Sequence, residues 1–591
     1  IMPRNKVLEK AKVTMPSGRS PFDLSQIRSF DALAGEIGVC YCQPMVAGTK
    51  GKISRRCFTR TAEVVSPAFH SVTEHFDFFI VPIHSLWRSW ENWKLNINDL
   101  QDTLTVPFNG LNNAPDLTLP SYAPRMNFNN IIDRTFNIGQ TFASSDAAEA
   151  VAHRAHDALR LLDQLGYDEF VGANTSGTAK VMNILCMGAY QKCYFDHFRN
   201  TAYESNNPYA YNFDWLYDSH LGLLDPDANS VTPSATKDIY VAEQLFKIRR
   251  VNYRNDYFHN IYPALNYVLS SPSGQGWVVP SNTGGFYPSA NSVPSAIGNN
   301  GGTVLVASAL QTTPSSSAPI SVQQLRAAFA LDKLMRASAY APKHVREQYK
   351  ALYGVDGVED FDMKSERIGS FQSDVAFQEV TNMTQSGNFD LGLLGAKGVG
   401  GDDNSKPINF YCKYDSIVIG LHYFMPRARY DSLGLHPWNI KIAREDFYIK
   451  AFENLGLRPF YAHYIDGQRA FGTIVGWSVP NFEYKILPDL NTGAFKRKFC
   501  IYTQQGSGPY TLSLDNQRTS ELSTYVPHNE TVFTGSAATA EYFKVAPEDL
   551  DNLFKVPVYG DHGRDYFQFF GEFRISVPVV APMSVHGQPS L

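Results

Sequence analysis

Short runs of alternating or continuously apolar residues near both ends of the chain predict β-strands. The clearest run, residues 72–83, is β-branched and aromatic and contains Pro82 near its end, a composition typical of strands. A comparable run covers residues 415–427. The full set of predicted strands is 36–46, 52–63, 72–83, 415–427, 471–479, 498–503 and 568–580.

The middle of the chain carries helical patterns instead. Asp146 is a candidate N-cap with Glu149 three positions later, which is the arrangement of a capping box at the start of a helix. Apolar residues then recur at helical spacing in several segments. The predicted helices are 146–165, 178–199, 321–339 and 343–353, the last two forming one region, 321–353.

This order of elements predicts an all-β core that is interrupted by a large insertion. Strands far apart in sequence pair routinely in Greek-key sheets, so the two ends can form one β-sandwich. We divide the chain into an extended basic arm (1–35), the first strands (36–100), an insertion region (101–370), and the remaining strands with a C-terminal tail (371–591). No apolar run is long enough to predict a membrane-spanning helix, and no basic-then-apolar leader opens the chain.

The composition supports an all-β protein with long ordered loops. Aromatic residues make up 13% of the chain and charged residues only 18%, alongside 42 glycines and 34 prolines, whereas a helical enzyme would carry more Lys and Glu. Residues 270–320 are rich in Gly, Ser, Pro and Asn, which cannot build a large core. They still contain Trp277, Phe286 and Tyr287, so we expect a surface loop that is ordered by packing against its neighbours.

Positive charge gathers at the N-terminus although the chain as a whole has a formal net charge of −5. A local excess of Lys and Arg is the pattern expected near phosphate groups. A solvated, disordered terminus is an equally good interpretation of the first twenty residues. The basic residues proposed to face nucleic acid there are Arg4, Lys6, Lys10, Lys12 and Arg19.

A second basic segment mixes cations with aromatic residues. Arg249, Arg250 and Arg254 lie among Tyr253, Tyr257 and Phe258, a combination that can bind phosphates and bases. The alternative is a contact surface between subunits, which the pattern favours slightly.

Three tryptophans, Trp87, Trp90 and Trp93, are spaced by three residues. They could stack bases or sugars, but the helical spacing favours a packed stripe.

Candidate catalytic motifs fail on inspection, and we expect no enzyme, no cofactor and no metal site. The glycine-rich run Gly395–Gly401 lacks the Lys and Ser/Thr of a phosphate-binding loop, and we predict an ordinary loop there. The acidic residues Asp356, Glu359, Asp360 and Asp362 could hold a cation between subunits, but such a run is more often a solvated face.

Six short segments, spread over nearly the whole chain, form a characteristic set. They are Phe22–Ser25; Phe76–Pro82 followed by Leu86 and Trp87; Ala189–Arg199; Arg249 and Arg250 with Asn255–Phe258 and Pro263; Val322–Leu331 with Tyr349 and Tyr353–Val355; and Ala581–Met583 with His586, Gly587 and Pro589. In order and spacing they resemble the major capsid proteins of microviruses, most closely the gokushovirus-like branch. The motif residues with a structural role in this resemblance are Phe76, Phe78, Phe79, Pro82, Trp87, Leu325 and Phe329.

The resemblance implies an eight-stranded antiparallel jelly roll with long loops and helical insertions. Many copies would form pentamers and then a T=1-like icosahedral shell around circular single-stranded DNA. The loop at about 270–320 would point outward and contact a receptor on the bacterial host surface.

Further partners implied by the resemblance are a small basic DNA-binding protein and a pilot or minor virion protein. The chain would be located in the virion after assembly in the host cytoplasm. The competing interpretation from the residues is a β-sandwich protein that binds or hydrolyses polysaccharide.

Overall fold

The structure of the protein is a computed structural model. It describes residues 18–64, 71–95, 122–128, 131–136, 145–167, 181–214, 230–231, 236–263, 333, 345–355, 364–381, 394–402, 406–428, 436–442, 444–450, 457–464, 472–490, 533–534, 537–550, 553–554 and 567–585. The predicted strand at 498–503, the predicted helix at 321–339 apart from Lys333, and the loop at 270–320 lie outside these residues.

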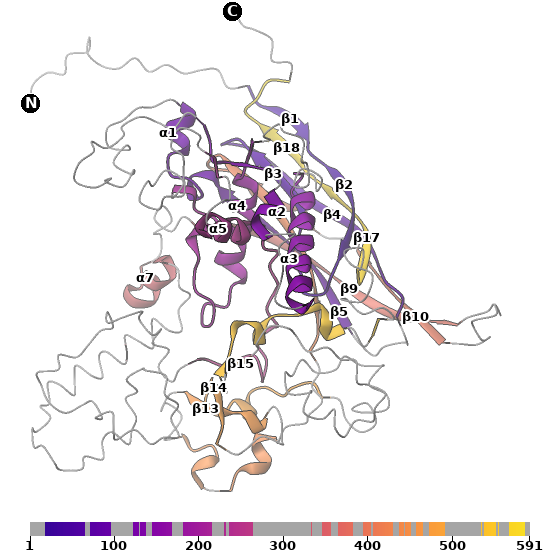
Figure 1. Cartoon of the computed structure of the whole chain (residues 1–591), viewed down its shortest axis with the longest axis vertical. Helices are drawn as coiled ribbons and strands as arrows, with labels where there is room; N and C mark the ends of the chain where they lie inside the picture. The colour runs from indigo at the N-terminus through magenta and orange to yellow at the C-terminus, as the bar shows by residue number, and fades with distance from the viewer. Residues whose placement is uncertain are drawn as a thin grey trace, which may run out of the picture.

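An antiparallel sheet of eleven strands forms the centre of the described chain (Figure 1). Its strands come from both ends of the sequence, as predicted. They are β1 (Ser20–Asp23), β2 (Gln26–Ala32), β3 (Gly38–Met45), β4 (Lys50–Thr61), β5 (Ser71–Pro82), β9 (Glu366–Thr381), β10 (Leu394–Asp402), β11 (Ile408–Tyr411), β12 (Ser416–Pro426), β17 (Phe569–Ser576) and β18 (Pro578–Ala581).

Neighbouring strands follow the order β1–β18–β4–β10–β9–β5–β12–β3, while β11 also pairs with β4, and β17 lies between β4 and β2. The long strand β4 therefore has two sets of neighbours. Its first half pairs with β11 and β18, and its second half with β10 and β17. Strand β5 pairs with β9, placing Ser71 opposite Ala376. This pairing joins the strands that precede the insertion to those that follow it, so strands from both ends of the chain form one sheet.

The sheet is curled, so that strands from its two margins meet. Nη1 of Arg28 in β2 donates a hydrogen bond of 3.0 Å to the carbonyl of Val39 in β3. The ring of Phe30 lies 4.6 Å from that of His422 and stacks at 5.3 Å on that of Phe573. These contacts enclose one face of the sheet, which we call the interior, and leave the other as the outer face.

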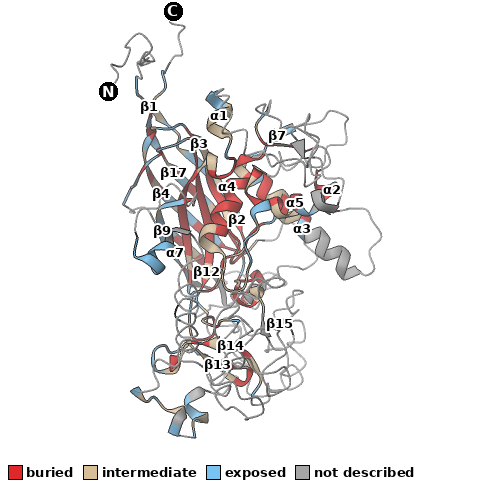
Figure 2. Cartoon of the chain, turned by 90° about the vertical axis from the view of Figure 1, so that its left-hand side faces the viewer, coloured by how far each residue is buried: buried red, intermediate tan, exposed pale blue. Residues whose placement is uncertain are grey.

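Strand β5 is buried on both faces, which explains its continuous apolar sequence. Phe76 and Phe78 point into the interior and belong to a cluster of buried residues there. Phe79 and Val81 belong to a second cluster on the opposite side, which includes the helices. Figure 2 shows the buried residues concentrated on the strands and on the helix surfaces that meet them.

The helices cover one half of the sheet's outer face. Helix α4 contacts β5 and β12, and α3 contacts β3. The helices are α1 (Trp90–Leu95), α2 (Ile131–Phe136), α3 (Ser145–Gln164), α4 (Leu185–Cys193), α5 (Thr236–Phe246) and α7 (Val345–Tyr353), and a π-helix (Tyr194–Phe198) continues α4. Short 3-10 helices occur at Ile83–Ser85, Pro208–Ala210, Pro437–Ile440, Arg444–Asp446, Ala462–Tyr464, Phe482–Tyr484, Ala540–Phe543 and Pro547–Leu550.

Helix α3 confirms the predicted helix at 146–165, and α7 confirms the one at 343–353. The prediction for 178–199 was partly wrong, because Val181–Asn183 is strand β7 and pairs with β6 (Arg125–Asn127). Oδ1 of Asn183 accepts a 2.7 Å hydrogen bond from the backbone N–H of Leu185, which marks the change from strand to helix. No helix within the described residues is long and apolar enough to cross a membrane.

We predicted a loop for the glycine-rich run Gly395–Gly401, and this prediction was wrong. The run is part of strand β10. Its backbone is held between β9 and β4, where side chains would not fit. A Cβ at Gly398 would lie 2.4 Å from Cγ2 of Thr61, and one at Gly401 would lie 2.9 Å from the carbonyl oxygen of Cys57. The glycines therefore serve close strand packing, a use of glycine that resembles a loop in sequence.

Two further expectations need refinement. Residues 20–32, placed in an extended arm, are extended but belong to the sheet as β1 and β2. The predicted strand at 471–479 is β14, in a separate small sheet. The small sheets pair β13 (Arg458–Tyr461) with β14 (Ile474–Ser478), β15 (Phe533–Thr534) with β16 (Ala537–Ala538), and β6 with β7 and β8 (Ser230–Val231).

Candidate nucleic-acid interface

The outer face of β4 is a row of cationic and aromatic side chains. Successive side chains of a strand point to opposite faces, and in β4 every second residue is exposed or half-buried while the alternate ones are largely buried in the interior. The exposed members are Lys50, Lys52, Arg56, Phe58 and Arg60. We call the outer face formed by these residues and their neighbours on β2, β11, β17 and β18 the β4 face.

Neighbouring strands extend this face. Arg574 of β17 lies opposite Arg56, and Glu572 lies opposite Phe58. Tyr411 of β11 lies opposite Lys50. Direct partners in an antiparallel pair project from the same face, so these cations and aromatic rings lie on one surface together with Glu572.

Cations and rings also touch within this surface. Nζ of Lys50 lies 5.3 Å from the ring centre of Tyr411, and the guanidinium of Arg60 lies 4.9 Å from that of Phe58. The exposed charged residues of β4 and β17 are all cations except Glu572. Lysine and arginine can bind phosphates while exposed rings stack on bases, which is the chemistry of single-strand binding surfaces.

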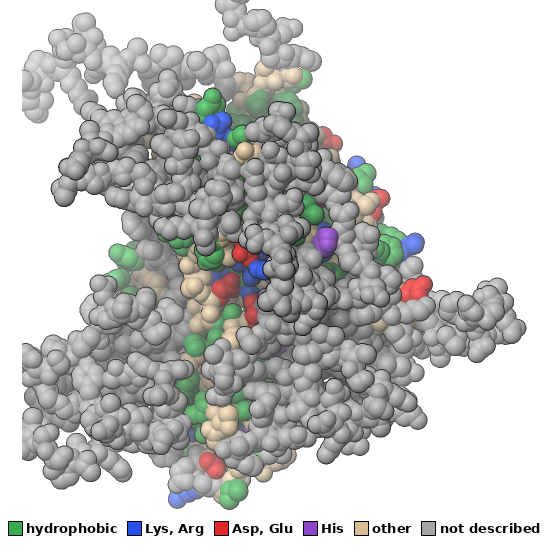
Figure 3. Space-filling view, viewed as in Figure 1, with side chains coloured by type: hydrophobic (Ala, Val, Ile, Leu, Met, Phe, Trp, Pro, Cys, Tyr) green, Lys and Arg blue, Asp and Glu red, His purple; other side chains and the backbone are tan. Residues whose placement is uncertain are grey.

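The helices lie over the other half of the sheet and leave the β4 face uncovered by any described helix (Figure 1). In Figure 3, basic, acidic and hydrophobic side chains all reach the surface along the right-hand margin, where Figure 1 draws β2, β17 and β10.

The cations of β4 were not among the site residues predicted from the sequence. The signal was present, because Lys52, Arg56 and Arg60 are separated by even numbers of residues within the predicted strand 52–63.

Most of the cations predicted in the N-terminal arm, Arg4, Lys6, Lys10 and Lys12, lie outside the described residues, so their role stays a prediction. Arg19 is exposed at the start of β1, where its guanidinium approaches Gly48. Of the other predicted residues, Trp277, Phe286, Tyr287, Leu325 and Phe329 also lie outside the described chain.

Arg249 was predicted to face DNA, and the structure instead buries it. Only 4% of it is exposed. Its Nε donates a 2.7 Å hydrogen bond to Oε1 of Gln191, and its guanidinium lies about 5 Å from the rings of Tyr194 and Phe195. Burial lowers the pKa of this guanidinium. Arg249 is an internal residue that joins α4 to the segment after α5.

The rest of this basic segment divides between core and surface. Tyr257 and Phe258 are buried in a third hydrophobic cluster with Phe460, so they cannot stack bases in the folded chain. Arg250 is half-buried, and its backbone forms a bridge with Glu36. Arg254 is exposed.

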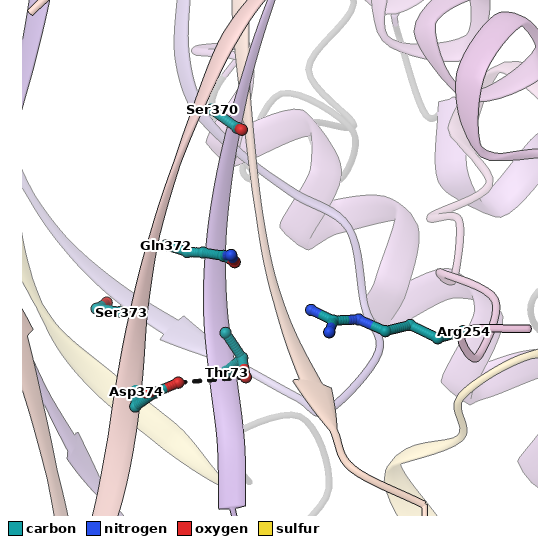
Figure 4. A pocket seen from close by; sticks show the side chains of 6 residues that line it. All are labelled: Thr73, Arg254, Ser370, Gln372, Ser373 and Asp374. Carbon is teal, nitrogen blue, oxygen red and sulfur yellow. Dashed lines mark hydrogen bonds between the residues drawn. The ribbon is translucent and has the colours of Figure 1, made fainter. Parts of the chain in front are cut away.

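Arg254 reaches toward the outer face of β9 and β5 and lines a pocket of about 570 Å³ (Figure 4). All the residues that line the pocket are polar or charged. Its lining residues are Thr73, Arg254, Ser370, Gln372, Ser373 and Asp374. Oγ1 of Thr73 donates to Oδ1 of Asp374 at 3.4 Å, and Nη2 of Arg254 lies 3.5 Å from Nε2 of His75.

The interior holds a second polar group centred on Glu74, which is fully buried. Oε1 of Glu74 lies 2.8 Å from Nε2 of His422 and accepts a 2.9 Å hydrogen bond from Thr59, while Oε2 accepts one of 2.9 Å from Ser373. Burial by itself would raise the pKa of Glu74, but the hydrogen bond and charge of His422 with the two hydroxyl groups hold it below its usual value. This group connects four strands.

The motif residues that the structure describes are packing residues. Phe76, Phe78, Phe79 and Trp87 are buried, and Pro82 ends β5. The tryptophan cluster is confirmed as a packed stripe, because the rings of Trp90 and Trp93 lie 5.6 Å apart and Trp93 lies 5.6 Å from Trp87.

Within the described residues, no group of three or more His, Cys, Asp or Glu side chains is placed to hold a metal ion. The acidic run 356–362 lies outside these residues. A search against protein-family models and a search of curated proteins both found no match to this chain.

Proposed function

We propose that this chain is the major coat subunit of a small icosahedral, T=1-like virion that encloses circular single-stranded DNA. The observation that carries the proposal is the order of strands in the curled sheet. Consecutive strands that continue one another, such as β1 with β2, β10 with β11, and β17 with β18, can be counted as single ribbons.

Numbered along the chain, the eight ribbons of the described sheet then follow the order 1-8-3-6-5-4-7-2. A jelly roll consists of two four-stranded sheets with the orders 1-8-3-6 and 2-7-4-5. The observed order corresponds to these two sheets joined along ribbons 6 and 5, which are β10/β11 and β9. Viral coat proteins are a major group with this architecture, although fold by itself does not establish function.

The charge of the sheet adds a second, independent argument. A coat subunit needs one surface for the genome, and the β4 face offers cations and rings in a pattern suited to single-stranded DNA. The N-terminal residues preceding β1 add further cations to the same chain. Arg249 is not among the residues that we propose to contact DNA, because it is buried.

Exposed apolar side chains supply a third argument, because a shell requires contacts between many copies. Ile442 is 90% exposed and Leu487 is 76% exposed. Trp438, Tyr448 and Tyr484 are also exposed, and the ring of Tyr484 contacts the rings of both Trp438 and Tyr448. Exposed apolar patches of this kind mark protein contacts. In the proposed virion, further partners are a small basic protein, a pilot protein and, through the loop at 270–320, a host receptor.

Electron microscopy of the purified chain, with and without single-stranded DNA and the proteins of neighbouring genes, tests the proposal. Closed isometric shells, or pentamers that close when partners are added, are the expected result. A chain that stays monomeric under every condition would refute it. A monomer with affinity for glycans would favour the alternative, a β-sandwich protein that binds or hydrolyses polysaccharide.

A further inference from the structure

The polar pocket beside Arg254 is continuous with the β4 face. Gly401 of β10 pairs with Phe58 of β4. Gly400 pairs with Val375 of β9, so the next step of the same register brings Gly401 beside Asp374. Because Gly401 has no side chain, strand β10 places no side chain between Phe58 and Asp374, which are two strand spacings, about 10 Å, apart.

The far side of this floor presents complementary hydrogen-bonding groups. Asp374 lies opposite Thr73 of β5, and both are part of the pocket lining. Arg254 extends toward them from outside the sheet, and Gln372 points toward Arg254, while the hydroxyl of Thr73 is directed to Asp374 (Figure 4). A carboxylate that only accepts hydrogen bonds therefore shares one pocket with a guanidinium that only donates them.

Among the four DNA bases, guanine matches such a pair best. Its Watson–Crick edge carries two neighbouring donors, N1–H and the N2 amino group, which suit the two oxygens of a carboxylate. Its other edge carries the acceptors O6 and N7, which arginine binds in a bidentate manner. Adenine, cytosine and thymine each place an acceptor where the carboxylate needs a donor. Unstacked bases of single strands are commonly recognised through these edges.

We propose that this pocket binds a guanine base of a DNA strand that crosses the β4 face. The inference rests on the proposed function, because it requires single-stranded DNA on that face. The phosphates contact the β4 cations, a base stacks on Phe58, and the guanine base turns over Gly401 into the pocket. The coat subunit then prefers strands that present guanine at suitable positions.

Binding of the purified full-length chain to short oligo(dT) strands with one central substitution tests this. The central base is dG, deoxyinosine, dA or dC, and affinity is measured by fluorescence anisotropy at fixed salt. Deoxyinosine lacks only the N2 amino group. Losing one hydrogen bond to a charged acceptor weakens binding about tenfold, so dG is expected to bind about tenfold more tightly than deoxyinosine.

The variant Asp374→Asn replaces one acceptor oxygen with a donor and should reduce the preference for dG over deoxyinosine to less than about twofold. Glu366→Gln is the matched control, because Glu366 is exposed on the same strand outside the pocket. It removes the same charge and should keep the preference.

Three outcomes separate the two proposals. Preference for dG that disappears in Asp374→Asn and survives in Glu366→Gln supports the inference. Equal binding of all oligonucleotides, or a preference that Asp374→Asn retains, overturns the guanine pocket but leaves the DNA-binding face intact. Failure to bind any oligonucleotide overturns the inference together with the DNA-facing role of the β4 face.

Discussion

Glu74 and His422 form a buried hydrogen-bonded pair in the interior of the curled sheet, with Oε1 of the glutamate 2.8 Å from Nε2 of the histidine. Thr59 and Ser373 donate to the same carboxylate. These four residues come from β4, β5, β9 and β12, so the pair links the uncovered half of the sheet to the half beneath the helices.

We expect Glu74→Leu to lower the free energy of unfolding by about 3–5 kcal/mol, because the remaining polar partners would be left buried without their acceptor. Denaturant unfolding of the unassembled subunit, followed by circular dichroism, measures this. Glu243→Leu is the control, since Glu243 pairs with Arg154 at the surface and should cost less than about 1 kcal/mol. Equal losses in both variants would contradict the structural role of the buried pair.

The β4 face should determine how DNA binding depends on salt. Each phosphate contact with a single strand contributes about 0.7 to the slope of log affinity against log salt concentration. The double variant Lys52→Gln/Arg60→Gln is therefore expected to reduce the slope by about 1.4. Arg444→Gln/Lys485→Gln removes two exposed cations elsewhere and should leave it unchanged. A reduced slope in the control alone would place the DNA on another surface.

Arg249 should behave as a core residue. Arg249→Gln removes its hydrogen bonds to Gln191 and Gln244 and its packing on Tyr194 and Phe195. We expect a loss of about 2–3 kcal/mol in unfolding free energy and an unchanged salt slope for DNA binding. A stable variant with a reduced slope would restore Arg249 to the DNA-facing set.

His75 gives a defined acid dependence. Burial lowers the pKa of His75 to about 4, whereas an unfolded histidine titrates near 6.5. Between pH 6.5 and 4, the unfolded chain therefore binds a proton at His75 that the folded chain does not bind. The free energy of unfolding is unaffected by His75 above about pH 6.5 and decreases as the pH falls toward 4. The decrease due to His75 is about 3 kcal/mol at most.

The variant His75→Phe keeps a ring against Tyr423, on which His75 stacks at 5.0 Å. Its unfolding free energy should fall less steeply than that of the parent between pH 6.5 and 4, because it has no proton to gain. Denaturant unfolding at a series of pH values measures the difference. Parallel curves for the two proteins would show that His75 does not titrate as its burial requires.

Gly571 should tolerate no side chain. A Cβ there would lie 2.2 Å from the backbone carbonyl oxygen of Phe58, and the backbone of a paired strand cannot move away cheaply. Gly571→Ala is expected to cost about 1–3 kcal/mol of unfolding free energy. Gly18→Ala, where nothing lies within 4 Å, should have little effect. A harmless Gly571→Ala would mean that β17 and β4 can separate locally.

Local sequence patterns were sufficient for the strands and helices with strong periodicity. The run at 72–83 predicted β5 because β-branched and aromatic residues fill a strand that is buried on both faces. The helix α3 followed from a repeated apolar spacing, although Asp146, predicted as its N-cap, lies within the helix, which includes Ser145. These signals depend on neighbours in the chain, so they are readable without the fold.

Long-range pairing decided the rest. The glycines of β10 resemble a loop until β9 and β4 are placed on either side, and only then does their lack of side chains become a packing requirement. Likewise Arg249 and Arg254 look equivalent in sequence, but α4 buries the first while the second stands over β9. The sequence by itself determined an all-β chain with a helical insertion, because local periodicity requires it. Only the tertiary structure decided which cations reach the surface, because that depends on which elements cover each face of the sheet.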